Sequence, residues 1–149
     1  MTRKDRTEGI YNRREVLDES ERRQYCLIQL KALLSYAYRY SEDVKKRFDR
    51  AQFNVEKFKT LSDIKHIPLL KKKELIFLQS IGPRLGGLLT KDIGELKRIF
   101  LSPGPIFDPE DRMDDYWGYT EAFYSVGFRP GDVVQVTFNY HLSPAGLMF

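Results

Sequence analysis

The residues of this chain best suited to chemistry lie between Arg98 and Pro109, where a β-leaning run enters a loop of glycine and prolines. Acidic residues in a helical pattern follow this loop. Free main-chain N–H groups and the dipole at the start of a helix favour an anion, so α/β proteins often hold phosphates at such loops. This loop has one glycine, Gly104, three prolines that donate no N–H, and no lysine. Its position therefore suggests nucleotide binding, while its residue types are unusual for that task.

The acidic residues around the loop oppose a bound triphosphate. Two like unit charges about 7 Å apart cost about 2 kcal/mol at an effective dielectric constant of about 20. The N-terminus of a helix stabilises a nearby anion by only about 0.3–1 kcal/mol, which is less than this repulsion. The sequence therefore favours a proline-stiffened loop that caps a helix with the carboxylates of Asp108, Glu110, Asp111, Asp114 and Asp115.

The elements that position this loop begin with a polar arm and an all-helical segment. Apolar residues recur at steps of three and four from Ser20 onward, which predicts a long amphipathic helix. Shorter helices are predicted over Val44–Ala51, from Ser62 to Pro68 and over Lys71–Gln79. We therefore expect an arm over residues 1–19 and a helical N-terminal segment over residues 20–87.

The second part of the chain alternates strand and helix patterns. Leu96–Leu101 and Val133–Phe138 are β-leaning runs, and Arg112–Val126 between them is strongly amphipathic. Short connections predict a βαβ unit with parallel strands and a right-handed crossover. The expected fold class is α/β, with residues 88–149 as a βαβ piece of a larger sheet. Because two parallel strands are not stable alone, we expect a fragment of a larger protein, or a sheet completed by another chain.

The composition indicates an ordinary soluble protein, with 42% hydrophobic and 31% charged residues. No stretch approaches about 18 apolar residues, and the charged start does not resemble a secretory signal, so a cytoplasmic location is expected. The single cysteine, Cys26, lies in an apolar helical pattern and is predicted to be a small core residue. One cysteine and two histidines without ligand spacing argue against a zinc site.

Charge is distributed unevenly along the chain. Residues 1–100 carry a net charge of +9, and residues 101–149 carry −5. A nucleic-acid-binding protein would need a clustered basic face with interleaved aromatic residues, so this split argues against that function. The basic runs Lys45–Arg47 and Lys71–Lys73 are predicted to be solvated helix faces. We expect no nucleic-acid or membrane partner.

Several segments together resemble the N-terminal part of phenylacetate–coenzyme A ligases, which are adenylate-forming enzymes. Leu27–Tyr38 is similar to the family's first long helix, and Ser41–Phe53 is similar to its continuation. The resemblance continues in Leu61–Pro68 followed by Lys72–Leu75, and in the turn Val126–Val133. Each segment is a weak signal alone, but their order and spacing make the resemblance specific.

This resemblance implies a protein that joins a carboxylic acid to AMP from ATP, with Mg²⁺, and then passes the acyl group to coenzyme A. At positions 102–109 the family has a loop rich in Ser, Thr and Gly, with a lysine, that grips the phosphates of ATP. Here only Ser102, Gly104 and Pro109 fit that pattern. Ser102 and Gly104 are thus the phosphate contacts that the resemblance implies, in a loop that has lost most of its usual residues.

The segment Asn139–Gly146 resembles the start of the family's acyl-substrate pocket. The resemblance implies that Tyr140 is an aromatic wall and that Ala145 and Gly146 are a small pair beside which a flat ligand can approach the backbone. His141 is a candidate gate residue or general base, although the sequence shows no partner for it. The family's later motifs have no room in 149 residues, so we expect no catalysis by this chain alone and assign no catalytic residue.

Two other functions remain open from the sequence. The chain could be a non-enzymatic interaction module that associates with itself or with another chain through an open sheet edge. It could also be a degenerate paralogue that has lost ATP-dependent adenylation. A small carboxylic acid is the partner of the ligase interpretation, and a second polypeptide is the partner of the interaction module.

Overall fold

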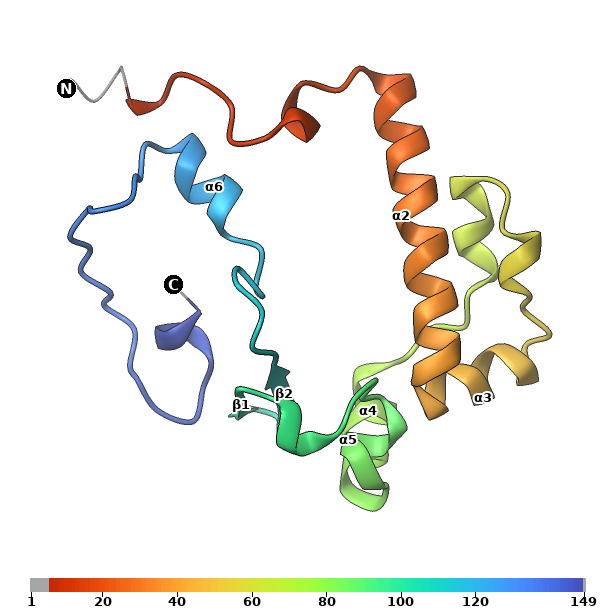
Figure 1. Cartoon of the computed structure of the whole chain (residues 1–149). Coiled ribbons are helices and arrows are strands. Elements are labelled where there is room, and N and C mark those ends of the chain that lie inside the picture. Colours follow the sequence, from red (N-terminus) through yellow and green to blue (C-terminus); the bar gives the residue numbers. More distant parts are fainter. Residues whose placement is uncertain (1–5, 149) are drawn as a thin grey trace.

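The computed structural model describes residues 6–148 and arranges its elements along a ring-shaped path (Figure 1). The first five residues of the predicted arm, and Phe149, lie outside the described residues. In chain order the elements are η1 (Arg13–Val16), α2 (Glu19–Tyr40), α3 (Glu42–Arg50), η2 (Val55–Lys57), η3 (Leu61–His66), α4 (Lys72–Ile81), α5 (Pro83–Gly87), η4 (Ile93–Glu95), β1 (Arg98–Ser102), β2 (Ile106–Glu110), α6 (Thr120–Ser125) and η5 (Ala145–Leu147). This mixture of helices and strands confirms the predicted α/β class.

The long helix α2 begins at a capping box and ends at a buried serine. The Asp18 carboxylate accepts a hydrogen bond from the Glu21 N–H at 2.8 Å, which satisfies one of the free donors of the first turn. Ser41 ends α2 and starts α3, and it is only 2% exposed. Its hydroxyl donates to the Gly87 carbonyl at 3.0 Å, so one serine joins α2, α3 and α5.

The main hydrophobic core lies where α2 packs against α3 and the two following 3-10 turns. Leu34, Phe48, Val55 and Phe58 form its buried centre, and Phe58 is 1% exposed. Phe48, Phe53 and Phe58 pack edge to face in succession, with ring centroids 4.8 and 6.4 Å apart. The helical pattern read from the sequence is confirmed here, with bounds that shift by a few residues.

Two expectations about the helical segment are wrong. Cys26 is exposed, because Leu27, Leu30 and Leu34 form the side of α2 that packs on the core. The helix expected from Ser62 is a 3-10 helix, η3, in which the Asp63 carboxylate accepts from the N–H groups of Lys59 and Thr60. This local cap, with Pro68 close behind, favours a short tight turn over a longer helix.

The predicted strand-to-helix loop is a β-hairpin turn. β1 pairs with β2 in antiparallel register, with Arg98 opposite Glu110 and Ser102 opposite Ile106. Gly104 adopts a φ of +133°, a conformation that glycine adopts without strain, so the chain reverses between the two prolines that flank it. The parallel βαβ unit expected from the sequence is therefore replaced, within residues 6–148, by a two-stranded antiparallel sheet.

The amphipathic helix predicted over Arg112–Val126 is reduced to α6. Asp115 and Gly118 both have positive φ, +48° and +73°, which a right-handed helix does not allow. The Asp115 carboxylate instead accepts a hydrogen bond from the Thr120 N–H at 3.1 Å. A side-chain hydrogen bond of this kind competes with helix formation, and here it delays the helix start to Thr120.

The strand predicted over Val133–Phe138 has no strand partner among the described residues. The segment forms part of the long C-terminal connection that leaves α6 and curves back toward the hairpin (Figure 1). A β-branched run becomes a strand only where another strand offers hydrogen bonds, and none of the described strands lies beside it.

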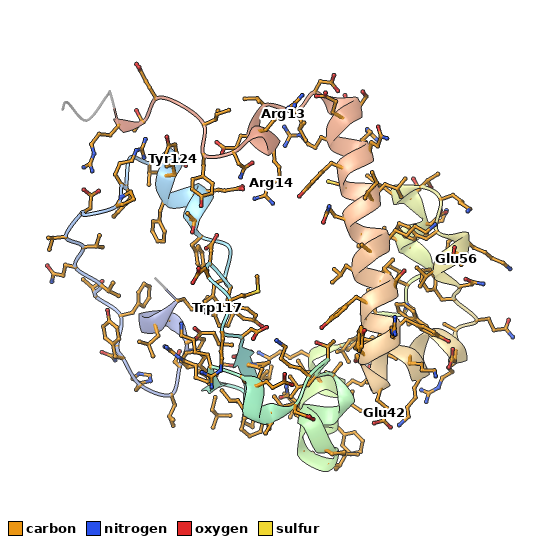
Figure 2. All side chains as sticks on the ribbon, in the orientation of Figure 1. Arg13, Arg14, Glu42, Glu56, Trp117 and Tyr124 are labelled. Carbon is orange, nitrogen blue, oxygen red and sulfur yellow. The ribbon has the colours of Figure 1, made fainter. Side chains whose placement is uncertain are left out.

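The N-terminal arm runs from α2 across to α6 and closes the ring (Figure 1). Arg6 pairs with Asp132, and Arg14 and Asn12 both donate to Glu121. Tyr11 packs on Tyr124 with ring centroids 5.5 Å apart. In Figure 2, Arg13 and Arg14 lie on the arm between α2 and the helix that carries Tyr124. None of the described helices combines the length and the apolar character that crossing a membrane would need.

Candidate functional site

The hairpin turn between β1 and β2 carries the residues that the sequence linked to phosphate. The Ser102 hydroxyl donates to the Ile106 carbonyl at 3.2 Å, so it closes the turn from inside. Gly104 is exposed at the tip, and Pro103 and Pro105 on either side offer no N–H group. The turn is thus held by its own hydrogen bond and presents few main-chain donors to a ligand.

Helix α4 supplies two side chains to this turn that sequence reasoning missed. The Lys72 ammonium lies 3.4 Å from the point where a Cβ on Gly104 would stand. The Gln79 amide pairs with both main-chain groups of Phe107: its Nε2 donates to the Phe107 carbonyl, and its Oε1 accepts from the Phe107 N–H, each at 2.9 Å. A lysine is therefore present at the turn, but from an element about thirty positions earlier in the chain rather than from the loop.

The second group of predicted site residues lies on the other side of the hairpin. The Leu101 N–H donates to the Leu142 carbonyl at 2.9 Å, which brings the segment Asn139–Gly146 beside β1. The structure thus places the two regions that the sequence linked to one site, around Ser102 and around Tyr140, on neighbouring stretches of chain.

Position 146 requires a glycine because the chain's own backbone lies close to it. A Cβ at this position would stand 2.4 Å from the Asn139 carbonyl oxygen, well inside van der Waals contact. Gly146 is buried and Ala145 is half-buried at the start of η5. Gly146 therefore serves a tight backbone crossing between residues 139 and 146.

Tyr140 and His141 are both exposed, and Tyr140 is 60% exposed. The His141 Nδ1 accepts a hydrogen bond from the Ser143 N–H at 3.1 Å, so this nitrogen is held in a local turn. No carboxylate pairs with the His141 ring among the described contacts, and the ring has no visible orienting group for acid–base work.

Two of the five acidic residues near the turn are neutralised by ion pairs. Glu110, 2% exposed, lies 2.9 Å from the Lys97 ammonium and 3.4 Å from the Arg98 Nε. Asp111 pairs with Lys91 at 2.5 Å, and this hydrogen bond lowers the pKa of Asp111 and raises that of Lys91. The repulsion of an anion at the hairpin is therefore weaker than a count of carboxylates predicts.

Tyr116 and Trp117 form an aromatic cluster with Phe100 beside these acids. Trp117 packs on Phe100 and Tyr116, with ring centroids 6.4 and 5.1 Å apart, and lies next to the hairpin in Figure 2. Burial, and then the nearby charges of Asp111 and Glu110, raise the pKa of the Tyr116 hydroxyl. This cluster packs the hairpin against the segment before α6.

An open, mainly apolar cavity of about 680 Å³ lies between α6 and the C-terminal connection. It is lined by Phe123, Phe128, Asp132 and residues 134–138. Its described lining includes none of the residues that the sequence assigned to phosphate or acyl substrate. A hollow of this size was not predictable from the sequence, because it depends on how the connection curves back.

The residues present at the turn fit a triphosphate poorly. Pro103, Pro105 and Pro109 lack N–H groups, and the Ser102 hydroxyl is already donated to Ile106. Within residues 6–148 no group of three or more His, Cys, Asp or Glu side chains could hold a metal ion. Lys72 is the cation at the tip, which is enough to attract a single anionic group but not to enclose a chain of phosphates.

The fold is nevertheless similar to that of a part of 2-hydroxyisobutyryl-CoA ligase. No protein-family model matches the chain, and no curated protein matches it either. Solved structures of 2-hydroxyisobutyryl-CoA ligase do match. The structure in the postadenylation state with 2-HIB-AMP has a TM-score of 0.83 and 24% identity, and the structure with 2-HIB-AMP and CoA has a TM-score of 0.81 and 23% identity. Both alignments cover 91% of this chain and 30% of the ligase, so the chain spans less than a third of these ligases.

Proposed function

We propose that this chain is the N-terminal part of an acid–coenzyme A ligase of the phenylacetate type. In that enzyme it gives structural support to the parts that carry the catalytic residues. The observation that carries the proposal is the similarity to 2-hydroxyisobutyryl-CoA ligase over 91% of the chain at a TM-score of 0.83. The sequence resemblance to phenylacetate–coenzyme A ligases supports the same reaction class.

In such a ligase a carboxylate oxygen attacks the α-phosphorus of ATP and pyrophosphate leaves, which gives an acyl-AMP. The thiol sulfur of coenzyme A then attacks the acyl carbon, the bond to AMP breaks, and AMP and a proton are released. We assign no step of this chemistry to residues 6–148, because the turn at Ser102–Ile106 fits a triphosphate poorly. The chain contributes two structural parts to such a ligase, the hairpin and the segment around Tyr140, and these two parts lie beside each other in the fold.

The test uses the protein that carries this chain as it is made in its own cell. ATP–pyrophosphate exchange is measured with a panel of small carboxylic acids that includes phenylacetate and 2-hydroxyisobutyrate, followed by thioester formation with coenzyme A. We expect exchange with at least one aromatic acid, and none from residues 1–149 alone. Exchange by the isolated 149 residues would show that the chain holds catalytic groups that we have not assigned.

A second candidate is a paralogue that has lost ATP-dependent adenylation, and the proline-flanked turn favours it. Isothermal titration of the same protein with ATP and with AMP separates the two candidates. Binding of AMP without a gain from the β- and γ-phosphates supports the degenerate paralogue. Tighter binding of ATP than of AMP supports the ligase.

A further inference from the structure

We propose that one side of α4 is a contact surface for an anionic lipid membrane. This surface, the α4 face, consists of Leu69, Leu70, Lys73, Phe77, Ser80 and Ile81. The proposal goes beyond the proposed function, because such a contact needs neither ATP nor a carboxylic acid. The expectation of no membrane partner rests on the lack of a spanning segment, and a contact with the surface of a membrane does not need one.

The α4 face is the side of the helix that the rest of the described chain leaves open. The other sides are occupied: the Gln79 amide bonds to the hairpin, and the Glu74 carboxylate lies 2.7 Å from an arginine of α3. Lys73, Phe77 and Ile81 follow one another at steps of four, so they lie along one side of the helix. All three are exposed, which shows that neither the hairpin nor α3 covers this side.

The side chains of the α4 face suit an apolar environment. Phe77 is 59% exposed, Ile81 is 65% exposed, and Leu69, shortly before the helix, is 84% exposed. The Ser80 hydroxyl donates to the Phe77 carbonyl at 2.7 Å, so this polar group is satisfied within the helix and does not need water. A face of this kind loses no hydrogen bond of Ser80 when hydrocarbon replaces the water around it.

A row of lysines stands beside these apolar side chains. Lys71–Lys73 are all exposed, and none of the ion pairs described within residues 6–148 includes them. The wider stretch of residues 42–73 carries ten Lys and Arg against five Asp and Glu. Each lysine near an anionic leaflet strengthens membrane binding by about fivefold at low salt, and its long stem allows the ammonium to reach the headgroups while apolar neighbours insert.

The same lysines argue against a second copy of the chain as the occupant. Two copies related by a two-fold axis would bring both lysine rows together, and like charges repel. A nucleic acid backbone or a purely acidic peptide would pair with the lysines but offers no apolar layer to Phe77 and Ile81. Helix α4 lies at a corner of the ring, on the side opposite the N-terminal arm (Figure 1). An anionic lipid surface is the partner that satisfies both the charges and the apolar side chains there.

The experiment measures, by flotation, how the protein that carries this chain, as it is made in its own cell, binds lipid vesicles. Vesicles of phosphatidylcholine with phosphatidylglycerol are compared with vesicles of phosphatidylcholine alone. We expect binding to the anionic vesicles that weakens as salt is added, and little binding to the neutral ones. Ile81→Ser should weaken the binding by about tenfold, because it removes apolar area that would enter the membrane. Lys73→Gln should weaken it by about fivefold at low salt.

Each variant has a matched control on another element. Ile93→Ser removes an isoleucine of η4 that is 51% exposed but stands beside Asp92 and Glu95 rather than lysines. Lys57→Gln removes an exposed lysine of η2. Both controls should bind anionic vesicles within about twofold of the wild type. Circular dichroism verifies that all four variants keep their helices.

Three results overturn the proposal. They are no binding to the anionic vesicles at low salt, equal losses in Ile81→Ser and Ile93→Ser, and displacement from the vesicles by polyglutamate or RNA that itself binds Ile81→Ser as well as the wild type. The last result assigns the lysines to a soluble polyanion. The assay contains no ATP and no acid, so a failed ATP–pyrophosphate exchange leaves its result standing, and a failure to bind vesicles leaves the proposed ligase function untouched.

Discussion

Arg14, on the N-terminal arm, forms an ion pair with Glu121 of α6, 107 positions further along the chain. The Asn12 amide donates to the same carboxylate. One acidic side chain on a short helix therefore holds two residues of the arm, and the arm spans the distance between α2 and α6 (Figure 1). This contact joins the basic and the acidic parts of the chain.

Arg14→Gln should loosen the arm without unfolding the core. The pair is partly exposed and such pairs contribute little, so exchange of the amides in residues 6–16 should quicken by about two- to fivefold at low salt. The difference should shrink as salt screens the wild-type pair. Arg23→Gln is the control, because Arg23 pairs with Glu19 within α2 and does not touch the arm. Unchanged exchange of residues 6–16 in Arg14→Gln contradicts the prediction.

Arg47→Met should be one of the costlier single changes in the helical segment. The Arg47 guanidinium bonds to Asp43 within α3 and lies 2.7 Å from Glu74 of α4, and the side chains of Arg47 and Asp43 are only 13% and 11% exposed. Loss of the cation leaves Asp43 without its partner, and the free energy of unfolding should fall by about 2–4 kcal/mol in urea titration. Lys46→Met removes the exposed pair with Glu42 and should change it by less than about 0.5 kcal/mol. Equal effects of the two variants would sink this account.

Gly146→Ala should destabilise the C-terminal connection. The added methyl group would meet the Asn139 carbonyl oxygen at 2.4 Å, so the backbone crossing must open, at a cost of about 1–3 kcal/mol. Gly94→Ala is the control, since nothing lies within 4 Å of a Cβ built there. Thermal unfolding of both variants checks the prediction, which fails if Gly146→Ala melts with the wild type.

The Lys91–Asp111 pair should contribute stability over a wide pH range. The pKa of Asp111 is lowered by its hydrogen bond from Lys91, so that contribution is complete above the ordinary aspartate value of 3.8 and is lost as the pH falls below it. The pKa of Lys91 is raised, so its contribution is complete below 10.5 and is lost as the pH rises further. Lys91→Met should remove the alkaline loss and reduce the acid loss, since the Arg112 N–H still lowers the pKa of Asp111. Lys73→Met, at an exposed lysine outside the described ion pairs, should keep both losses. Urea titrations at several pH values measure this, and identical pH profiles for wild type and Lys91→Met would refute it.

The helical part was largely predictable, because local pattern and tertiary packing agree there. The steps of three and four from Leu27 to Leu34 mark the face of α2 that packs on the core. Cys26 was misplaced for the same local reason, since it stands one position from that face. The amphipathic pattern over residues 112–126 wrongly predicts one long helix, because the positive φ values of Asp115 and Gly118 interrupt the helix.

The hairpin was missed because its glycine was interpreted as part of a phosphate loop rather than as a reversal. A signal was available: Lys97 and Arg98 before the turn and Glu110 after it are complementary charges, and the antiparallel register brings them together. The contacts from α4 had no local signal, since Lys72 and Gln79 reach the hairpin only through the fold.

On both edges of the hairpin, outward-facing main-chain groups of one pair of opposed residues are already hydrogen-bonded. Leu101 and Phe107 face each other across the sheet; the Leu101 N–H is bound by the Leu142 carbonyl, and both main-chain groups of Phe107 are bound by the Gln79 amide. A glutamine side chain thereby imitates a neighbouring strand and blocks fibril-like growth of the sheet on that side. The hairpin is therefore a terminated piece of sheet, because at this pair of residues neither of its two edges offers free main-chain groups to a further strand.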